Sequence, residues 1–199
     1  MRQLLFIFLF IPFFSNGQHR DVSKNIITIG DSLKNIGIDT FIVFKEYCIG
    51  YEEDISAIDY DYCESKDQIF IFYKKNESSF IQKKNECFIF KPISDSSRVF
   101  DYLIENFNAI SKEKILMYSY VSEENGKIMY THAEHSCYNE LYISINKKFK
   151  LLNVDLNNIE KYSDTDKKLN LNYQHNINSK TYKLLLLIGD YLNTKKFIK

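Results

Sequence analysis

The amino-acid sequence predicts an α+β fold, with a mostly antiparallel sheet built from hairpins and packed with an N-terminal, a central and a C-terminal helix. Three segments carry apolar residues at helical spacing, and the segments between them are rich in β-branched and aromatic residues. Most of these strand-like segments are joined by turns too short for the crossover that parallel strands need. Antiparallel pairing between neighbours in the chain is therefore expected.

The first residues, 1–17, are typical of a secretory signal peptide. Arg2 precedes an apolar run from Leu4 to Phe14, and Ser15-Asn16-Gly17 places small residues at a cleavage site. A membrane span needs roughly 20 apolar residues, more than this run provides. We expect export to the periplasm or the extracellular space, followed by one α+β domain over residues 18–199 with no membrane span.

The predicted N-terminal helix begins near Asp21 or Ser23, either of which can cap it. Its apolar residues recur at spacings of three and four: Val22, Ile26, Ile29, Leu33 and Ile36. Gly37 stands where a left-handed residue ends a helix. Directly afterwards, Thr40–Ile49 is β-branched and aromatic, which predicts a strand with much of both faces covered.

A hairpin is predicted next, with strands Gln68–Tyr73 and Phe80–Lys83 joined by a polar turn. Glu86–Ile93 is predicted to be a further strand, and Pro92 indicates that its end lies at an edge of the sheet or leaves the sheet. A central helix follows, capped within Asp95-Ser96-Ser97. Its apolar stripe consists of Val99, Phe100, Leu103, Ile104 and Phe107.

The second half carries four more predicted strands: Lys114–Val121, Lys127–Thr131, Glu140–Ile145 and Phe149–Val154. Asn125-Gly126 between the first two is a strong hairpin signal. After a polar stretch from Asn157 to Asn178, Ser179 can cap the last helix, whose apolar run through Leu192 predicts deep burial.

Four cysteines lie in the part expected to be exported: Cys48, Cys63, Cys87 and Cys137. An oxidising compartment and an even count favour disulfides over buried thiols. Four cysteines allow three pairings, and the sequence does not decide between them. We favour Cys48–Cys63 with Cys87–Cys137, because the first bridge closes one loop and the second links two distant strands.

Gly30-Asp31-Ser32-Leu33 follows an apolar stretch and resembles the nucleophile block of the GDSL esterase/lipase family. This resemblance implies a hydrolase with Ser32 as nucleophile. The family also has a Gly-x-Asn-Asp block and an Asp-x-x-His block, which this sequence lacks. The helical periodicity moreover places Ser32 within a helix, so we predict no catalytic residue and no cofactor. A GDSL-type hydrolase ranks last among the alternatives.

His132, His135 and Cys137 are potential ligands for zinc or copper within six residues. Their spacing matches no established zinc framework, and no fourth ligand is evident. Metal binding is therefore an alternative function, and a polar loop with one bridged cysteine is the simpler interpretation.

Residues 46–67 form an acidic, tyrosine-rich segment with eight carboxylates and one lysine. Its candidate binding residues are Tyr51, Glu52, Glu53, Asp54, Asp59, Tyr60, Asp61 and Tyr62. Calcium loops have a spacing that is missing here. Tyrosine offers a large contact area at low entropy cost, and carboxylates attract a basic partner, although such charge runs are often only solvated.

The whole chain has balanced charge, with 26 basic and 26 acidic residues, which does not favour nucleic acid as a partner. The leading hypothesis is an exported, non-catalytic binding protein with a protein partner, such as a periplasmic inhibitor or an immunity-type module that uses the acidic segment.

Overall fold

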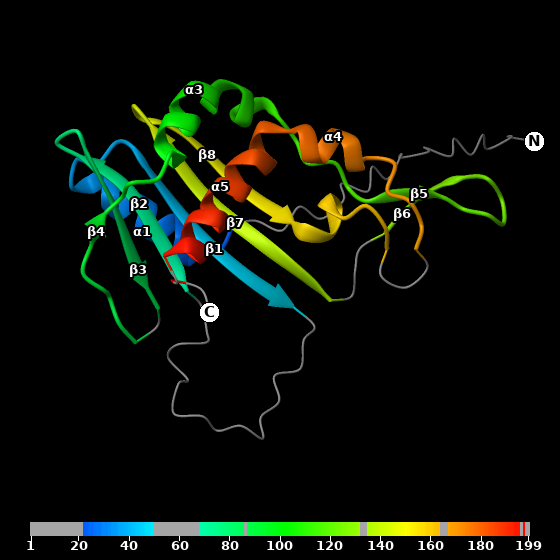
Figure 1. The fold of residues 1–199 in the computed structure, drawn as a ribbon, viewed down its shortest axis with the longest axis horizontal. Coiled ribbons are helices and arrows are strands. Elements are labelled where there is room, and N and C mark those ends of the chain that lie inside the picture. Colours follow the sequence, from blue (N-terminus) through cyan, green and yellow to red (C-terminus); the bar gives the residue numbers. More distant parts are fainter. Residues whose placement is uncertain are drawn as a thin grey trace, which may run out of the picture.

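The computed structural model describes residues 22–49, 68–85, 87–131, 135–163, 167–195 and 197. A six-stranded antiparallel sheet has the order β4-β3-β2-β1-β7-β8, and β5 and β6 form a separate two-stranded sheet (Figure 1). The strands of the large sheet are β1 (Phe41–Ile49), β2 (Ile69–Lys75), β3 (Ser78–Lys84), β4 (Ile93–Ser94), β7 (Ser136–Ile145) and β8 (Lys148–Asp155). The small sheet pairs β5 (Ser119–Val121) with β6 (Ile128–Tyr130). The predicted fold class is confirmed.

Helices cover both faces of the large sheet. They are α1 (Lys24–Asn35), α3 (Val99–Lys112), α4 (Tyr173–Asn178) and α5 (Lys180–Thr194), together with the 3-10 helix η1 (Leu156–Ile159). α3 and α5 lie along one face (Figure 1) and α1 packs against the other. Because β1, β2 and β7 are enclosed on both sides, their sequences are continuous apolar runs over much of their length.

Each face has its own core. The larger core joins the sheet to Val99, Phe100, Leu103, Phe107 and Ile110 of α3 and to Leu184, Leu185, Ile188 and Leu192 of α5. The smaller one contains Val22, Ile26, Ile38, Phe41, Val43, Ile69, Ile71 and Tyr142. No helix of the described part is long and apolar enough to cross a membrane.

The N-terminal helix has the predicted end. Gly37 adopts φ +81°, its N–H donates to the Lys34 carbonyl (2.9 Å), and the Ile38 N–H donates to the Leu33 carbonyl (3.0 Å). These two bonds form a Schellman motif, which satisfies carbonyls at the helix end. At the other end Ser23 is the N-cap, and its side chain does not cap the helix itself.

Gly30 lies where α1 approaches β7 most closely. A Cβ atom at this position would overlap the ring of Tyr142. The Tyr142 hydroxyl donates to Asp31 (3.0 Å), so the helix and the strand are also joined by a polar contact. The glycine of the Gly30-Asp31-Ser32-Leu33 tetrapeptide therefore permits close packing of a helix against the sheet.

Hairpin turns of the large sheet use residues with positive φ. Asn76 (49°) and Glu77 (63°) join β2 to β3, and Asn146 (48°) and Lys147 (68°) join β7 to β8. This conformation at both central residues matches the twist of paired strands. The predicted hairpins are confirmed, with β7 beginning earlier than expected.

Two predicted strands are shorter in the structure. Of Glu86–Ile93, only an isolated bridge at Ile89 and the start of β4 are paired. The Asn85 side chain accepts from the N–H groups of Cys87 and Phe88 and turns the chain there. The edge position indicated by Pro92 is confirmed, because β4 is an outer strand of the sheet.

Of the predicted strand Lys114–Val121, only Ser119–Val121 is a strand. Asparagine side chains bond the backbone before it: Asn176 Oδ1 accepts from the Leu116 N–H (2.8 Å), and Asn158 Oδ1 accepts from the Tyr118 N–H (2.8 Å). These side chains come from α4 and η1, which lie in the polar stretch of the sequence. These asparagine side chains bond backbone groups that a neighbouring strand would bond in a sheet.

Ser179 caps the last helix as predicted. Its hydroxyl oxygen accepts from the Tyr182 N–H (3.0 Å). The helix buries four leucine or isoleucine side chains, whereas Leu186 is exposed on the opposite side. Deep burial therefore holds for one face of α5 and is wrong for the helix as a whole.

Candidate functional site

The polar end of the β1–β7 pair is the strongest candidate for a functional site. We define it as Lys45–Ile49 of β1 with Ser136–Glu140 of β7, which are paired in antiparallel register. The remaining part of the same pair is almost entirely apolar and buried. Both segments singled out in the sequence meet this end: the acidic segment 46–67 begins within β1 and continues past Ile49, and residues 132–135 precede Ser136.

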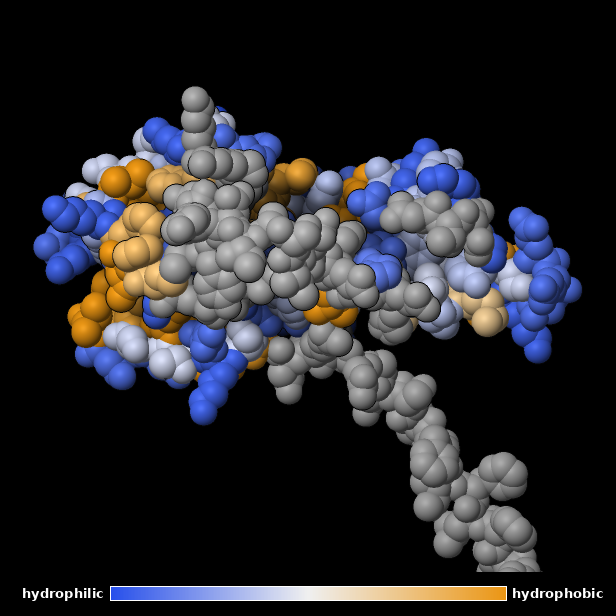
Figure 2. All heavy atoms as spheres, turned by 90° about the horizontal axis from the view of Figure 1, so that it is seen from below, coloured by the Kyte–Doolittle hydropathy of each residue, from blue (hydrophilic) through white to orange (hydrophobic). Residues whose placement is uncertain are grey.

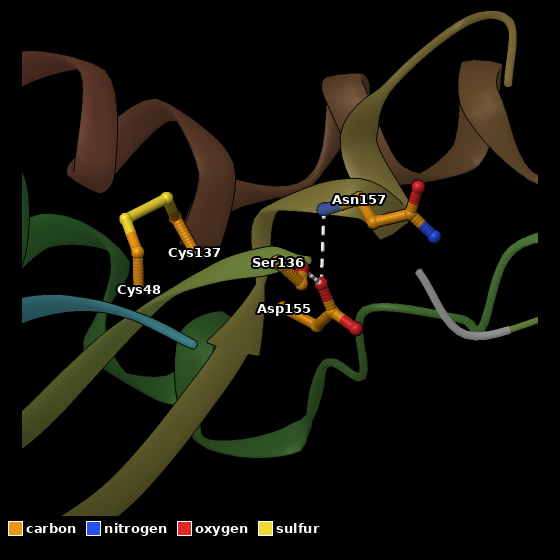
Figure 3. Close-up of a disulfide and its surroundings, with 5 residues drawn as sticks. All are labelled: Cys48, Ser136, Cys137, Asp155 and Asn157. Carbon is orange, nitrogen blue, oxygen red and sulfur yellow. Dashed lines mark hydrogen bonds between the residues drawn. A yellow bond between two sulfur atoms is a disulfide. The ribbon is translucent and has the colours of Figure 1, made fainter. Parts of the chain in front are cut away.

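A disulfide between Cys48 and Cys137 joins the two strands at this end (Figure 3). The two residues are direct register partners, and their Cα atoms are 3.9 Å apart. The preferred pairing of Cys48 with Cys63 and of Cys87 with Cys137 is therefore wrong. β1 and β7 are far apart in the chain, so local sequence patterns do not reveal that they are neighbours.

Cys87 is also disulfide-bonded. The remaining cysteine of the sequence is Cys63, which lies outside the described residues. The prediction that the cysteines are oxidised is thus confirmed for the three that the structure describes.

On the α1 side of the polar end, two tyrosines stack across the strands. The rings of Tyr47 and Tyr138 are 5.3 Å apart at an interplanar angle of 16°. The Lys45 ammonium lies 5.5 Å from the centre of the Tyr47 ring. Both rings are partly exposed, and partly exposed aromatic surface is suited to contacts with a protein partner.

Glu140 is 2% exposed and ties this end to α1. Its Oε1 accepts from the Ser23 N–H (2.9 Å), and its Oε2 accepts from the Ser23 hydroxyl (2.6 Å). A carboxylate at a helix N-terminus is favoured by the helix dipole. No local feature of the sequence distinguishes Glu140, because its partner is 117 residues away.

The start of β7 is also bonded to the end of β8 (Figure 3). The Ser136 hydroxyl donates to Asp155 Oδ1, and the Asn157 N–H donates to the same oxygen (3.0 Å). Ser136 and Asp155 are both buried. The start of β7 is therefore held by two contacts. One is the hydrogen bond from Ser136 to Asp155, and the other is the disulfide between the adjacent Cys137 and Cys48.

Glu46 and Asn139 face each other in the β1–β7 register. Partial desolvation by the surrounding protein raises the pKa of the Glu46 carboxyl, although its side chain remains exposed. The Asn139 Oδ1 atom is buried and has no hydrogen-bond partner among the described residues. Of these two groups, only the Glu46 carboxyl is exposed at the polar end.

The acidic tyrosine-rich residues Tyr51, Glu52, Glu53, Asp54, Asp59, Tyr60, Asp61 and Tyr62 lie outside the described residues. So does His132, whereas His135 directly precedes β7. The Cys137 sulfur is bonded to Cys48 and is not available as a thiolate ligand. In the described ranges, no group of three or more His, Cys, Asp or Glu side chains is placed to hold a metal ion.

Ser32 lies within α1 and not at a turn between a strand and a helix. Its hydroxyl is exposed and donates to the Thr28 carbonyl one turn earlier (2.8 Å). Asp31, beside it, pairs with Lys34 (3.7 Å). The predicted helix is confirmed at this position, and the tetrapeptide does not have the setting of a hydrolase nucleophile.

Two exposed apolar surfaces were not recognised in the sequence. One comprises Phe88, Ile89, Phe90 and Ile93, beside β3 and β4, where apolar atoms reach the surface in the view from below (Figure 2). The other comprises Val121, Ile128, Met129 and Tyr130 in the β5–β6 hairpin. Periodicity alone does not separate such residues from buried ones.

Comparisons of the chain with protein-family models, with curated proteins and with solved structures find no match.

Proposed function

We propose that this chain is an exported, non-catalytic binding protein that holds a basic protein partner at the polar end of the β1–β7 pair. An inhibitor or an immunity-type protein is the concrete form of this proposal. Export is supported by the signal-like residues 1–17 and by the disulfide, which is a bond typical of oxidising compartments.

The observation that carries the proposal is the position of the Cys48–Cys137 disulfide. It lies two residues before position 50, where the acidic tyrosine-rich segment continues beyond the described strand. A crosslink there fixes the start of the segment relative to the sheet. A binding segment with a fixed base loses less conformational freedom when it binds, which favours affinity.

Charge reversal tests the role of the carboxylates. A partner recovered by co-purification with the exported protein is purified, and its association rate is measured by biolayer interferometry at low and high salt. The triple variant Glu52→Lys, Glu53→Lys, Asp54→Lys is expected to associate at least about tenfold more slowly at low salt, because complementary charge steers encounter. The difference should diminish as salt screens the charges.

Asp101 and Glu105 provide the matched control. Both are exposed acids on α3, remote from the polar end in the chain. Reversing both to lysine changes the net charge by four units, against six for the triple variant, and should leave the association rate within about twofold of wild type. Equal slowing by both variants would mean that only net charge matters, and an unchanged rate for the triple variant would exclude the segment as the contact.

A further inference from the structure

The β5–β6 hairpin has an open edge on β6. The Thr131 N–H donates to the Tyr118 carbonyl (3.2 Å), and the Ser122 N–H donates to the Lys127 carbonyl (2.9 Å). Because backbone groups alternate in direction along a strand, Lys127, Met129 and Thr131 face β5. The N–H and C=O groups of Ile128 and Tyr130 therefore point away from β5.

The side chains of this edge are unusually exposed for apolar residues. Ile128 is 57% exposed, Met129 41% and Tyr130 67%. On the other side of the hairpin, the Leu171 N–H donates to the Ser119 carbonyl (2.8 Å), so β5 already has a neighbour there. Of the two sides of this small sheet, β6 is the one whose outward backbone groups have no backbone partner in the described part of the chain.

The outer strands of the large sheet differ from β6. β4 has two residues and follows Lys91-Pro92, and the proline has no N–H to donate. β8 carries Lys148 and Lys150. Lysine, proline and short length are the features by which proteins prevent pairing at sheet edges. β6 is also short, with three residues, and follows Lys127, but Ile128–Tyr130 itself contains neither lysine nor proline.

From this geometry we infer that β6 pairs antiparallel with β6 of a second copy of the chain. A two-fold axis at Met129 places Ile128 opposite Tyr130 of the second copy, so that the outward backbone groups of both residues meet. Each apolar side chain then faces an apolar side chain, and Lys127 faces Thr131. The register is self-complementary and brings no like charges together.

Pairing two hairpins creates a four-stranded sheet, which is more stable than an isolated two-stranded one. The hairpin projects from the end of the molecule beyond the large sheet (Figure 1), so its edge is accessible to a second copy. Three paired residues on each side form a small contact, which favours a concentration-dependent dimer over a permanent one. The inference does not depend on the acidic segment or its partner.

Sedimentation velocity of the purified, oxidised protein over a concentration series tests the inference. The wild-type chain should shift from monomer to dimer as concentration rises. Met129→Lys places two like charges opposite each other at the two-fold axis and should weaken the dimer at least about tenfold. Ile104→Lys is the matched control, because Ile104 is 49% exposed on α3 and away from the edge.

A covalent trap provides a second readout. Met129→Cys should form an intermolecular disulfide on oxidation, because residues directly opposite in a non-hydrogen-bonded pair have Cα atoms about 4.5 Å apart. Ile104→Cys should not do so beyond background, and circular dichroism should show that all variants are folded. A wild-type chain that stays monomeric at every concentration would overturn the inference, as would equal crosslinking of the two cysteine variants. A dimer that survives Met129→Lys would also overturn it.

Discussion

The β1–β7 strand pair is built differently at its two ends. At one end, Phe41–Phe44 and Leu141–Ile145 are buried between helices on both faces of the sheet. At the polar end, the strands are held by the Cys48–Cys137 disulfide, by a tyrosine stack and by hydrogen bonds to Glu140 and Asp155. The first end is stabilised by burial, and the second by specific, directional contacts.

This difference separates stability from binding. The apolar end is enclosed by helices and offers little surface to a partner, whereas the polar end exposes Glu46 and Cys48 even though several of its polar side chains are buried. The disulfide and the directional hydrogen bonds hold these partly exposed strand ends together. Changes at the two ends should therefore have effects of different size and kind.

The largest effect is expected from an aromatic truncation at the apolar end. Phe41 is completely buried, and its ring is 5.4 Å from that of Tyr142. Phe41→Ala should lower the free energy of unfolding by about 3–5 kcal/mol. Tyr47→Ala removes a similar ring from the stack at the polar end and should lower the free energy of unfolding by less, because Tyr47 is only partly buried and its stacking contributes about 0.5–1.5 kcal/mol beyond the buried area. Urea denaturation measures both, and equal losses would contradict the contrast between the ends.

Removal of the disulfide should have the next largest effect. The double variant Cys48→Ala, Cys137→Ala opens a bridge between residues 89 positions apart. Disulfides typically contribute about 2–4 kcal/mol, and chain entropy for a loop of this length puts the upper bound of the loss between about 4 and 5 kcal/mol. Thermal denaturation monitored by circular dichroism should show the lower melting temperature. A loss below about 1 kcal/mol would mean that the other contacts of the polar end suffice.

A pair of glycine variants tests the packing of α1 at the middle of β7. Gly30→Ala places a methyl group against the Tyr142 ring and should destabilise the protein by about 1–3 kcal/mol. Gly189→Ala in α5 meets no atom within 4 Å and should stabilise it by up to about 1 kcal/mol through helix propensity. Stabilisation by both substitutions, measured in urea, would show that the Gly30 contact is not tight.

The sequence predicts those parts of the fold that have local causes. Helical spacing and Gly37 define α1, the cap at Ser179 starts α5, and turn composition reveals the hairpins of the large sheet. The predicted strand Lys114–Val121 is wrong for the residues before Ser119, because asparagines distant in the chain bond the backbone there. The effect of such side chains depends on which segments meet in three dimensions.

The candidate site is less predictable for the same reason. The acidic segment and the cysteines are visible as sequence features, but the pairing of Cys48 with Cys137 follows from a strand register between distant parts of the chain. Glu140 and Asp155 also look like ordinary strand-end acids until their partners Ser23 and Ser136 are placed beside them. Local patterns carry no information about these contacts.

Hydrogen–deuterium exchange of the complex with a co-purified partner tests the central claim most directly. Exchange is compared, peptide by peptide, between the free exported protein and the complex. Binding at the polar end predicts new protection in peptides covering residues 45–67 and 135–140, with little change in α3, which lies on another part of the surface. Protection confined to α3, or to the exposed residues 88–93, would contradict the claim.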